Sequence, residues 1–137
     1  MQLSSEKAMA GPLWVALGSA LGGMARYGVS GVVANRVGET FPWGTLVVNV
    51  SGCFVVGVFA AAIGPGGALA GSLTARQFVL IGLCGGYTTF SSFSLQTLAL
   101  ARDGDWGRAL ANIAVSVALC LVAVWAGFTA GALIPAG

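Results

Sequence analysis

The stretch GLCGGYTTFSSFSLQT, Gly82 to Thr97, decides the fold because it lies within an apolar span yet makes a poor membrane helix. Gly85 and Gly86 lower the helix propensity at its middle, and the hydroxyl residues Tyr87 to Thr89 follow them. A helix break at membrane depth exposes carbonyls and amides, so it persists only where protein, water or an ion covers it. The sequence therefore predicts a membrane helix that is broken near Gly85 and covered by the rest of the chain.

Aromatic and hydroxyl side chains alternate after the predicted break. Phe90 and Phe93 are three residues apart and therefore share one face of a resumed helix. Small hydroxyl residues surround the two rings: Ser91, Ser92, Ser94 and Thr97. Paired phenylalanines usually pack in a core, but hydroxyls beside a helix break also fit the lining of a polar pathway.

The composition indicates a membrane protein with a single domain. The chain has 137 residues, of which 57% are hydrophobic and 7% are charged, whereas a soluble domain carries about 25% charged residues. The 22 glycines fit helices that pack closely in a lipid bilayer. The net charge is only +2 and the sequence has no basic run, so we expect no nucleic-acid partner.

Long apolar runs set the expected architecture, since about 20 residues cross a bilayer as a helix. The sequence predicts four such helices, at about 12–37, 44–63, 74–101 and 108–133. Pro12 suits the first turn of the first helix. The expected fold class is an all-α membrane protein whose third helix is broken near its middle.

Positive charges are almost evenly divided between the two ends of the predicted helices. One side carries Lys7 and Arg76, and the other carries Arg36, Arg102 and Arg108. The positive-inside rule therefore gives almost no orientation bias. This balance permits insertion in both directions and an antiparallel, dual-topology homodimer.

Arg26 is the charged residue near the middle of the first predicted helix. It follows Gly18 and Gly22 at intervals of four, so we expect it to face a packing surface or a water cavity rather than lipid. A charge at this depth is costly, which makes Arg26 a candidate functional residue. The alternative is that its side chain snorkels or caps the carbonyls of another helix.

Polar residues also mark the second and fourth predicted helices. Asn49 lies one turn after Thr45, and Asn112, Ser116 and Cys120 recur at intervals of four. Both sets fit donors that line a pathway. Both also fit hydrogen bonds between helices, which contribute about 0.6 kcal/mol on average in membrane proteins.

The ionisable residues exclude most enzyme chemistry. The acidic residues lie in the tail and the loops: Glu6, Glu39, Asp103 and Asp105. Without histidine or a carboxylate inside a span, the chain offers neither an acid–base pair nor a proton relay. We therefore expect no enzyme. The remaining hydroxyls, amides and positively polarised ring edges suit a small anion.

Three segments resemble the Fluc (CrcB) family of fluoride channels. They are GGMARYG at Gly22–Gly28, PWGTLVVNVSGCFVVG at Pro42–Gly57 and GLCGGYTTFSSFSLQT at Gly82–Thr97. The resemblance implies a dual-topology homodimer in the bacterial cytoplasmic (inner) membrane that exports fluoride passively. It also implies two pores at the antiparallel interface and a structural sodium ion at the dimer centre.

The resemblance also assigns roles to individual residues. It implies that the backbone carbonyls of Gly85 and Thr88 hold the sodium ion, and that Arg26 lies near the entry vestibule. It places these residues along the ion pathway: Asn49, Phe90, Phe93, Thr45, Ser94 and Ser116. Thr89, Ser91 and Cys120 are further positions on the same polar track.

Two other membrane functions remain as alternatives. A small dual-topology multidrug exporter also has four spans, but that class relies on a membrane carboxylate, which this sequence lacks. A non-transporting membrane subunit would leave the helix break and Asn49 without a purpose. Release of fluoride, but not chloride, from liposomes without a proton gradient would separate the channel from both.

Overall fold

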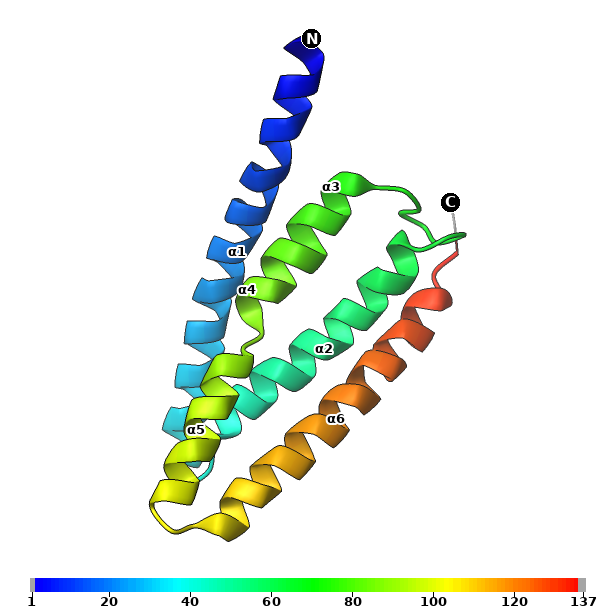
Figure 1. Ribbon diagram of the computed structural model, residues 1–137. Helices are drawn as coiled ribbons and strands as arrows, with labels where there is room; N and C mark the ends of the chain where they lie inside the picture. Colours follow the sequence, from blue (N-terminus) through cyan, green and yellow to red (C-terminus); the bar gives the residue numbers. More distant parts are fainter. Residues whose placement is uncertain (1, 136–137) are drawn as a thin grey trace.

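The computed structural model describes residues 2–135, with side chains from residue 10 onward, so the Lys7 side chain lies outside the described part. The regular structure of the described residues is entirely helical (Figure 1). Its elements are α1 (Gln2–Val37), α2 (Trp43–Ile63), α3 (Leu73–Ala75), the π-helix η1 (Arg76–Cys84), α4 (Gly85–Tyr87), α5 (Phe90–Arg102) and α6 (Trp106–Ala132).

Three stretches of helix in the described part are long and apolar enough to cross a membrane. They are Trp43–Ile63, Leu73–Arg102 and Trp106–Ala132. The prediction of an all-α membrane protein is therefore confirmed. The helix α1 is longer, at 36 residues, and it begins well before Pro12, which lies inside it rather than in its first turn. The residues ahead of Pro12 include good helix formers, which explains the earlier start.

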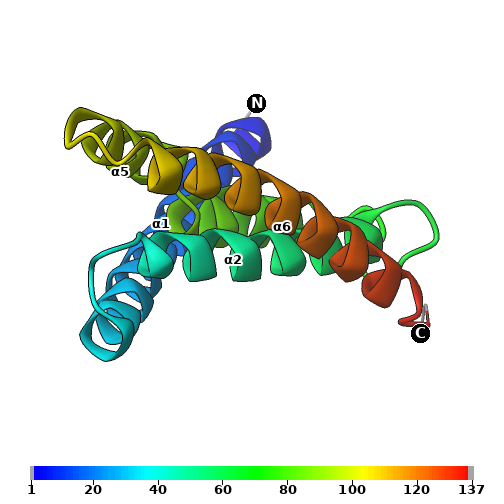
Figure 2. The same ribbon diagram turned by 90° about the horizontal axis from the view of Figure 1, so that it is seen from below.

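The helices form two closely packed pairs that run in opposite directions. In Figure 1, α1 and the segment α3–α5 run downward, whereas α2 and α6 run upward. Figures 1 and 2 both show α2 and α6 side by side. Glycines permit the close approach in the second pair. A β-carbon at Gly57 would clash with the Val124 carbonyl, and one at Gly127 would clash with the Phe54 carbonyl.

The pair of α1 with η1 and α4 is built in the same way. A β-carbon at Gly22 would clash with the Leu83 carbonyl and lie 2.8 Å from the Tyr87 nitrogen. A β-carbon at Gly86 would lie 2.5 Å from the Ser19 carbonyl oxygen. The glycines of the third helix therefore bring its first half into backbone contact with α1.

The third helix is interrupted at Thr88 and Thr89, three residues beyond the predicted position. Gly85 remains helical, whereas Thr88 has φ −77° and ψ 156°, and Thr89 has φ −151° and ψ 112°. Gly82 and Gly86 serve close packing on α1, whereas Gly85 is exposed and a β-carbon there would contact no residue of α1. The break begins where the Thr89 backbone amide donates to the Asn49 side chain of α2 instead of to a carbonyl of its own helix. The sequence pattern alone did not reveal this contact.

Candidate functional site

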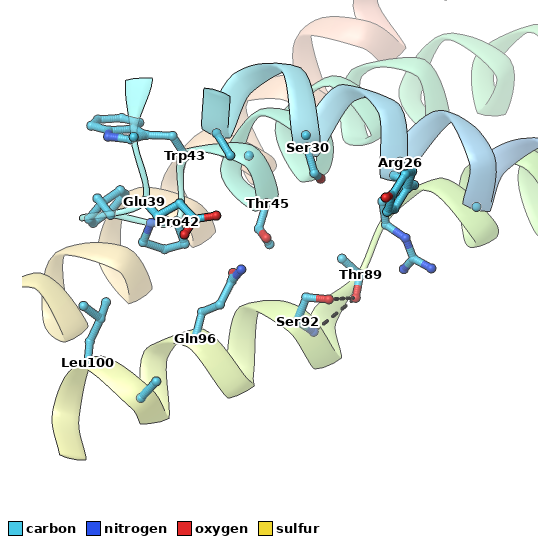
Figure 3. A pocket seen from close by; sticks show the side chains of 18 of the residues that line it. Arg26, Ser30, Glu39, Pro42, Trp43, Thr45, Thr89, Ser92, Gln96 and Leu100 are labelled. Atoms are coloured by element: carbon cyan, nitrogen blue, oxygen red, sulfur yellow. Dashed lines mark hydrogen bonds between the residues drawn. The ribbon is translucent and has the colours of Figure 1, made fainter. Parts of the chain in front are cut away.

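A polar hollow of about 880 Å³ lies beside the break, between one end of α1, the start of α2 and the helix α5 (Figure 3). Arg26 and Ser30 line it from α1, and Thr45 lines it from α2. Thr89, Ser92 and Gln96 line the opposite wall. The loop residues Glu39, between α1 and α2, and Asp103, after α5, also line the hollow. The hollow thus joins two stretches that are far apart in the sequence, 23–45 and 89–103.

Arg26 supplies positive charge to this hollow. Its side chain is half-buried and points toward Thr89 in Figure 3. Among the described side chains, the only ion pair joins Arg108 to Asp105, at 3.1 Å. The Arg26 guanidinium therefore remains available to a negatively charged partner, and its position agrees with an aqueous cavity rather than lipid.

Gln96 was not among the predicted site residues, yet it also lines the hollow. Its side chain extends toward Thr45 in Figure 3. The Gln96 Oε1 atom is buried and has no hydrogen-bond partner within the described part of the chain. A buried acceptor without a protein partner, in a polar space of this size, is suited to contact with water.

Asn49 binds the break with both ends of its side-chain amide. Its Oδ1 accepts a hydrogen bond from the Thr89 backbone N–H at 2.7 Å, and its Nδ2 donates to the Thr89 carbonyl at 3.0 Å. The side chain thereby replaces the partners that a neighbouring helical turn would provide. Since an amide carries two N–H donors, one donor of Asn49 remains for another acceptor.

This clamp has a direct effect on the carbonyl of Gly85. In a continuous α-helix, the Thr89 amide would donate to Gly85, four residues earlier. Because it donates to Asn49 instead, the Gly85 carbonyl loses its helical partner. Thr88 remains attached to the preceding turn through its N–H and its hydroxyl, which both donate to the Cys84 carbonyl at 2.9 Å.

The helix after the break starts with a cluster of hydroxyls. Thr89 caps α5, since its Oγ1 accepts a hydrogen bond from the Ser92 N–H at 3.1 Å. The same hydroxyl donates to the Ser92 hydroxyl at 3.0 Å and lies 3.2 Å from that of Ser91. Polar atoms of this cap therefore face the hollow that contains Arg26.

The two phenylalanines of α5 differ sharply in exposure. Their ring centroids lie 5.3 Å apart, so they are in contact as the three-residue spacing predicted. Phe93 is only 8% exposed, whereas Phe90 is 77% exposed. Phe93 packs within this chain, and Phe90 presents its ring to whatever lies outside it.

The remaining predicted pathway residues fall into separate neighbourhoods. Thr45 is buried beside the hollow, and the exposed Ser94 donates to the Phe90 carbonyl at 2.9 Å. Ser116 is buried on α6, where its hydroxyl donates to Asn112 of the same helix at 3.2 Å. One protomer therefore does not join all of these residues in a single channel.

No group of three or more His, Cys, Asp or Glu side chains that could hold a metal ion occurs in the described part of the chain. Hard cations also accept backbone carbonyl oxygens as ligands. The carbonyl of Gly85 has the required chemistry, and the residue is exposed beside the break.

Comparison with known proteins gives a consistent result. A family model described as "CrcB-like protein, Camphor Resistance (CrcB)" matches residues 13–128. A protein of Opitutus terrae is 59% identical over 118 residues, which cover 86% of this chain and 89% of the relative. A protein of Methylocella silvestris is 57% identical, covering 84% and 88%, and one of Rhodospirillum rubrum is 52% identical, covering 91% and 97%. All three relatives are named fluoride-specific ion channel FluC.

Proposed function

The chain belongs to the CrcB family, and from this premise we propose that it is a fluoride-selective channel that exports fluoride passively across the bacterial inner membrane. The name of its relatives supports the choice of ion, and the long apolar helices make it a multi-pass membrane protein. The observation that carries the proposal is the polar helix break, which Asn49 stabilises next to a hollow lined by Arg26, a residue without an ion pair among the described side chains.

The working unit in this proposal is an antiparallel homodimer of four-span protomers. In addition to the three long apolar helices, α1 serves as a membrane span in this proposal. Its 36 residues extend over about 54 Å at 1.5 Å per residue, which is more than a bilayer requires. The exposed ring of Phe90 and the exposed Ser94 need a covering surface. A second, inverted copy supplies one, and two equivalent pores then lie at the interface between the copies.

The pathway begins in the hollow, which serves as the vestibule. Arg26 attracts the anion by its charge, and hydroxyl and amide donors then replace the water around it. We assign the hydroxyl and amide donors to Thr45, Asn49, Ser94 and Ser116, and place Phe90 and Phe93 on the same pathway through the positive edges of their rings. Asn49 contributes the amide hydrogen that its clamp on Thr89 leaves free.

The chemistry of these groups suits fluoride. Removing water from a small anion is costly unless other donors replace it. Hydroxyls, an amide and the positive edges of phenyl rings do so at several weak sites, so the ion can also leave. A narrow pore would exclude the larger chloride ion by size.

The residues at the break also fit a structural sodium ion. The Gly85 carbonyl has lost its helical amide, and Thr88 is extended, so both carbonyls are suited to bind a cation. When bound, the cation would contribute a fixed positive potential at the dimer centre. Replacing sodium by a bulky organic cation is expected to lower the thermal stability of the dimer in detergent.

The proposal is tested by anion release from liposomes that contain the purified protein. Fluoride should leave the liposomes rapidly without a proton gradient, whereas chloride should be retained. Lack of fluoride release by well-folded protein would contradict the channel and favour a non-transporting subunit. Release that required a proton gradient would instead favour an exporter of the multidrug type, although the chain has no carboxylate inside its predicted spans.

A further inference from the structure

Asn112 is a polar residue at the buried face of α6, outside the set assigned to the pathway. It is 2% exposed, less than any other polar residue of the described core. A buried amide is costly unless its hydrogen-bonding groups are satisfied. Its Nδ2 donates to the Thr97 hydroxyl at 2.8 Å, and its Oδ1 accepts from the Ser116 hydroxyl at 3.2 Å.

These bonds belong to a chain with a fixed direction. The Thr97 hydroxyl donates its only hydrogen to the Phe93 carbonyl at 2.7 Å. It can therefore only accept from Asn112, which fixes the orientation of the amide. The Asn112 oxygen is then turned toward Ser116, and the hydrogens run from Ser116 to Asn112, on to Thr97, and finally to Phe93.

The same series of hydrogen bonds connects α5 to α6. The bond from Asn112 to Thr97 is the only side-chain hydrogen bond that joins α5 to α6 within the described residues. The helix α5 packs chiefly on α6, because the glycine contacts with α1 end before the break. Phe93, whose carbonyl accepts the last of these hydrogen bonds, is a buried residue of α5.

We propose that Asn112 is a positioning residue for anion permeation, which holds Phe93 in place and controls the hydrogen of Ser116. This inference rests on the proposed channel function. The Ser116–Asn112 bond, at 3.2 Å, is the longest of the three, so it yields most easily to a competing acceptor. Fluoride accepts hydrogen bonds more strongly than chloride does, so the Ser116 hydroxyl exchanges its hydrogen bond to Asn112 for one to fluoride more readily than for one to chloride.

The test compares fluoride and chloride release by variants that break the link. Asn112→Leu and Thr97→Val each remove it at nearly constant volume, and we expect about tenfold slower fluoride release, as for a lost buried hydrogen bond. The double variant should be no slower than the slower single variant, since the two residues act through one bond. Asn112→Leu should also reduce the ratio of fluoride to chloride release, which a purely structural role would not alter.

Two further variants serve as controls. Thr97→Ser keeps the hydroxyl and should restore most of the rate. Thr129→Val removes a similar hydroxyl of α6, which bonds only to the Trp125 carbonyl of its own helix, and should leave the rate unchanged.

The possible outcomes separate this inference from the channel proposal. If the original protein releases no fluoride, the channel proposal fails. If it does release fluoride, unchanged rate and selectivity in folded Asn112→Leu and Thr97→Val protein would overturn the role of Asn112 alone. If Asn112→Leu does not fold, the milder Thr97→Val replaces it in the test. Unchanged fluoride release by Thr97→Val protein that is as stable to heat in detergent as the original protein would overturn the role of Asn112.

Discussion

The two halves of the third helix are held in place by different forces. The half before the break, Leu73–Tyr87, contacts the backbone of α1 through glycines. The half after it, Phe90–Arg102, is fixed through individual hydrogen bonds, from Asn49 to Thr89 and from Asn112 to Thr97. The first half is therefore sensitive to any added atom, whereas the second depends on a few polar pairs. This difference suits a rigid frame formed by Leu73–Tyr87 on α1, and a conducting surface on Phe90–Arg102.

The largest effect is expected from crowding the frame. Gly22→Ala would place a β-carbon against the Leu83 carbonyl, and it should lower the free energy of unfolding by about 3 kcal/mol. Gly23→Ala is the matched control, because nothing lies within 4 Å of a β-carbon there. Thermal unfolding in detergent measures both. Equal stability of the two variants would show that glycine packing does not hold the first half.

The next effect concerns the clamp at the break. Asn49→Leu leaves the Thr89 N–H and carbonyl without their partners, at a cost of about 2 kcal/mol of stability. It should also abolish fluoride release, because the amide donor is lost together with the geometry of the break. Full fluoride release by this variant would contradict both roles.

A smaller effect is expected at the cap of α5. Thr89→Val removes the hydroxyl that accepts from the Ser92 N–H, and it should cost about 1 kcal/mol of stability. Thr89→Ser retains the hydroxyl and should be close to the original protein in thermal unfolding. If Thr89→Val were as stable as Thr89→Ser, the cap would not contribute to holding the second half.

The same comparison shows what the sequence could reveal. The helical class, the existence of a break and the packing role of Gly18 and Gly22 follow from local composition and spacing. The break was predicted near Gly85 because glycine has a low helix propensity. Its actual place depends on Asn49, which is 40 residues distant from its partner Thr89 and acts only in the folded chain.

The contacts of the second half were harder to predict. The spacing of Asn112 and Ser116 indicated one polar face of α6, and the structure joins the two residues by a hydrogen bond and places Asn112 against α5. No pattern in the sequence pairs Asn112 with Thr97, since that contact arises from the packing of two helices. Similarly, spacing put Phe90 and Phe93 on one face, but it could not reveal that only Phe93 is buried.

The most direct test of the account is fluoride release from liposomes by Phe90→Ile protein, measured beside Ile81→Val. Both residues are exposed apolar positions of the third helix, one on each side of the break, so neither change should unfold the protomer. We predict that Phe90→Ile strongly lowers fluoride release while Ile81→Val leaves it unchanged. Unchanged release by Phe90→Ile protein would remove Phe90 from the pathway and contradict the assignment of conduction to the second half of the helix.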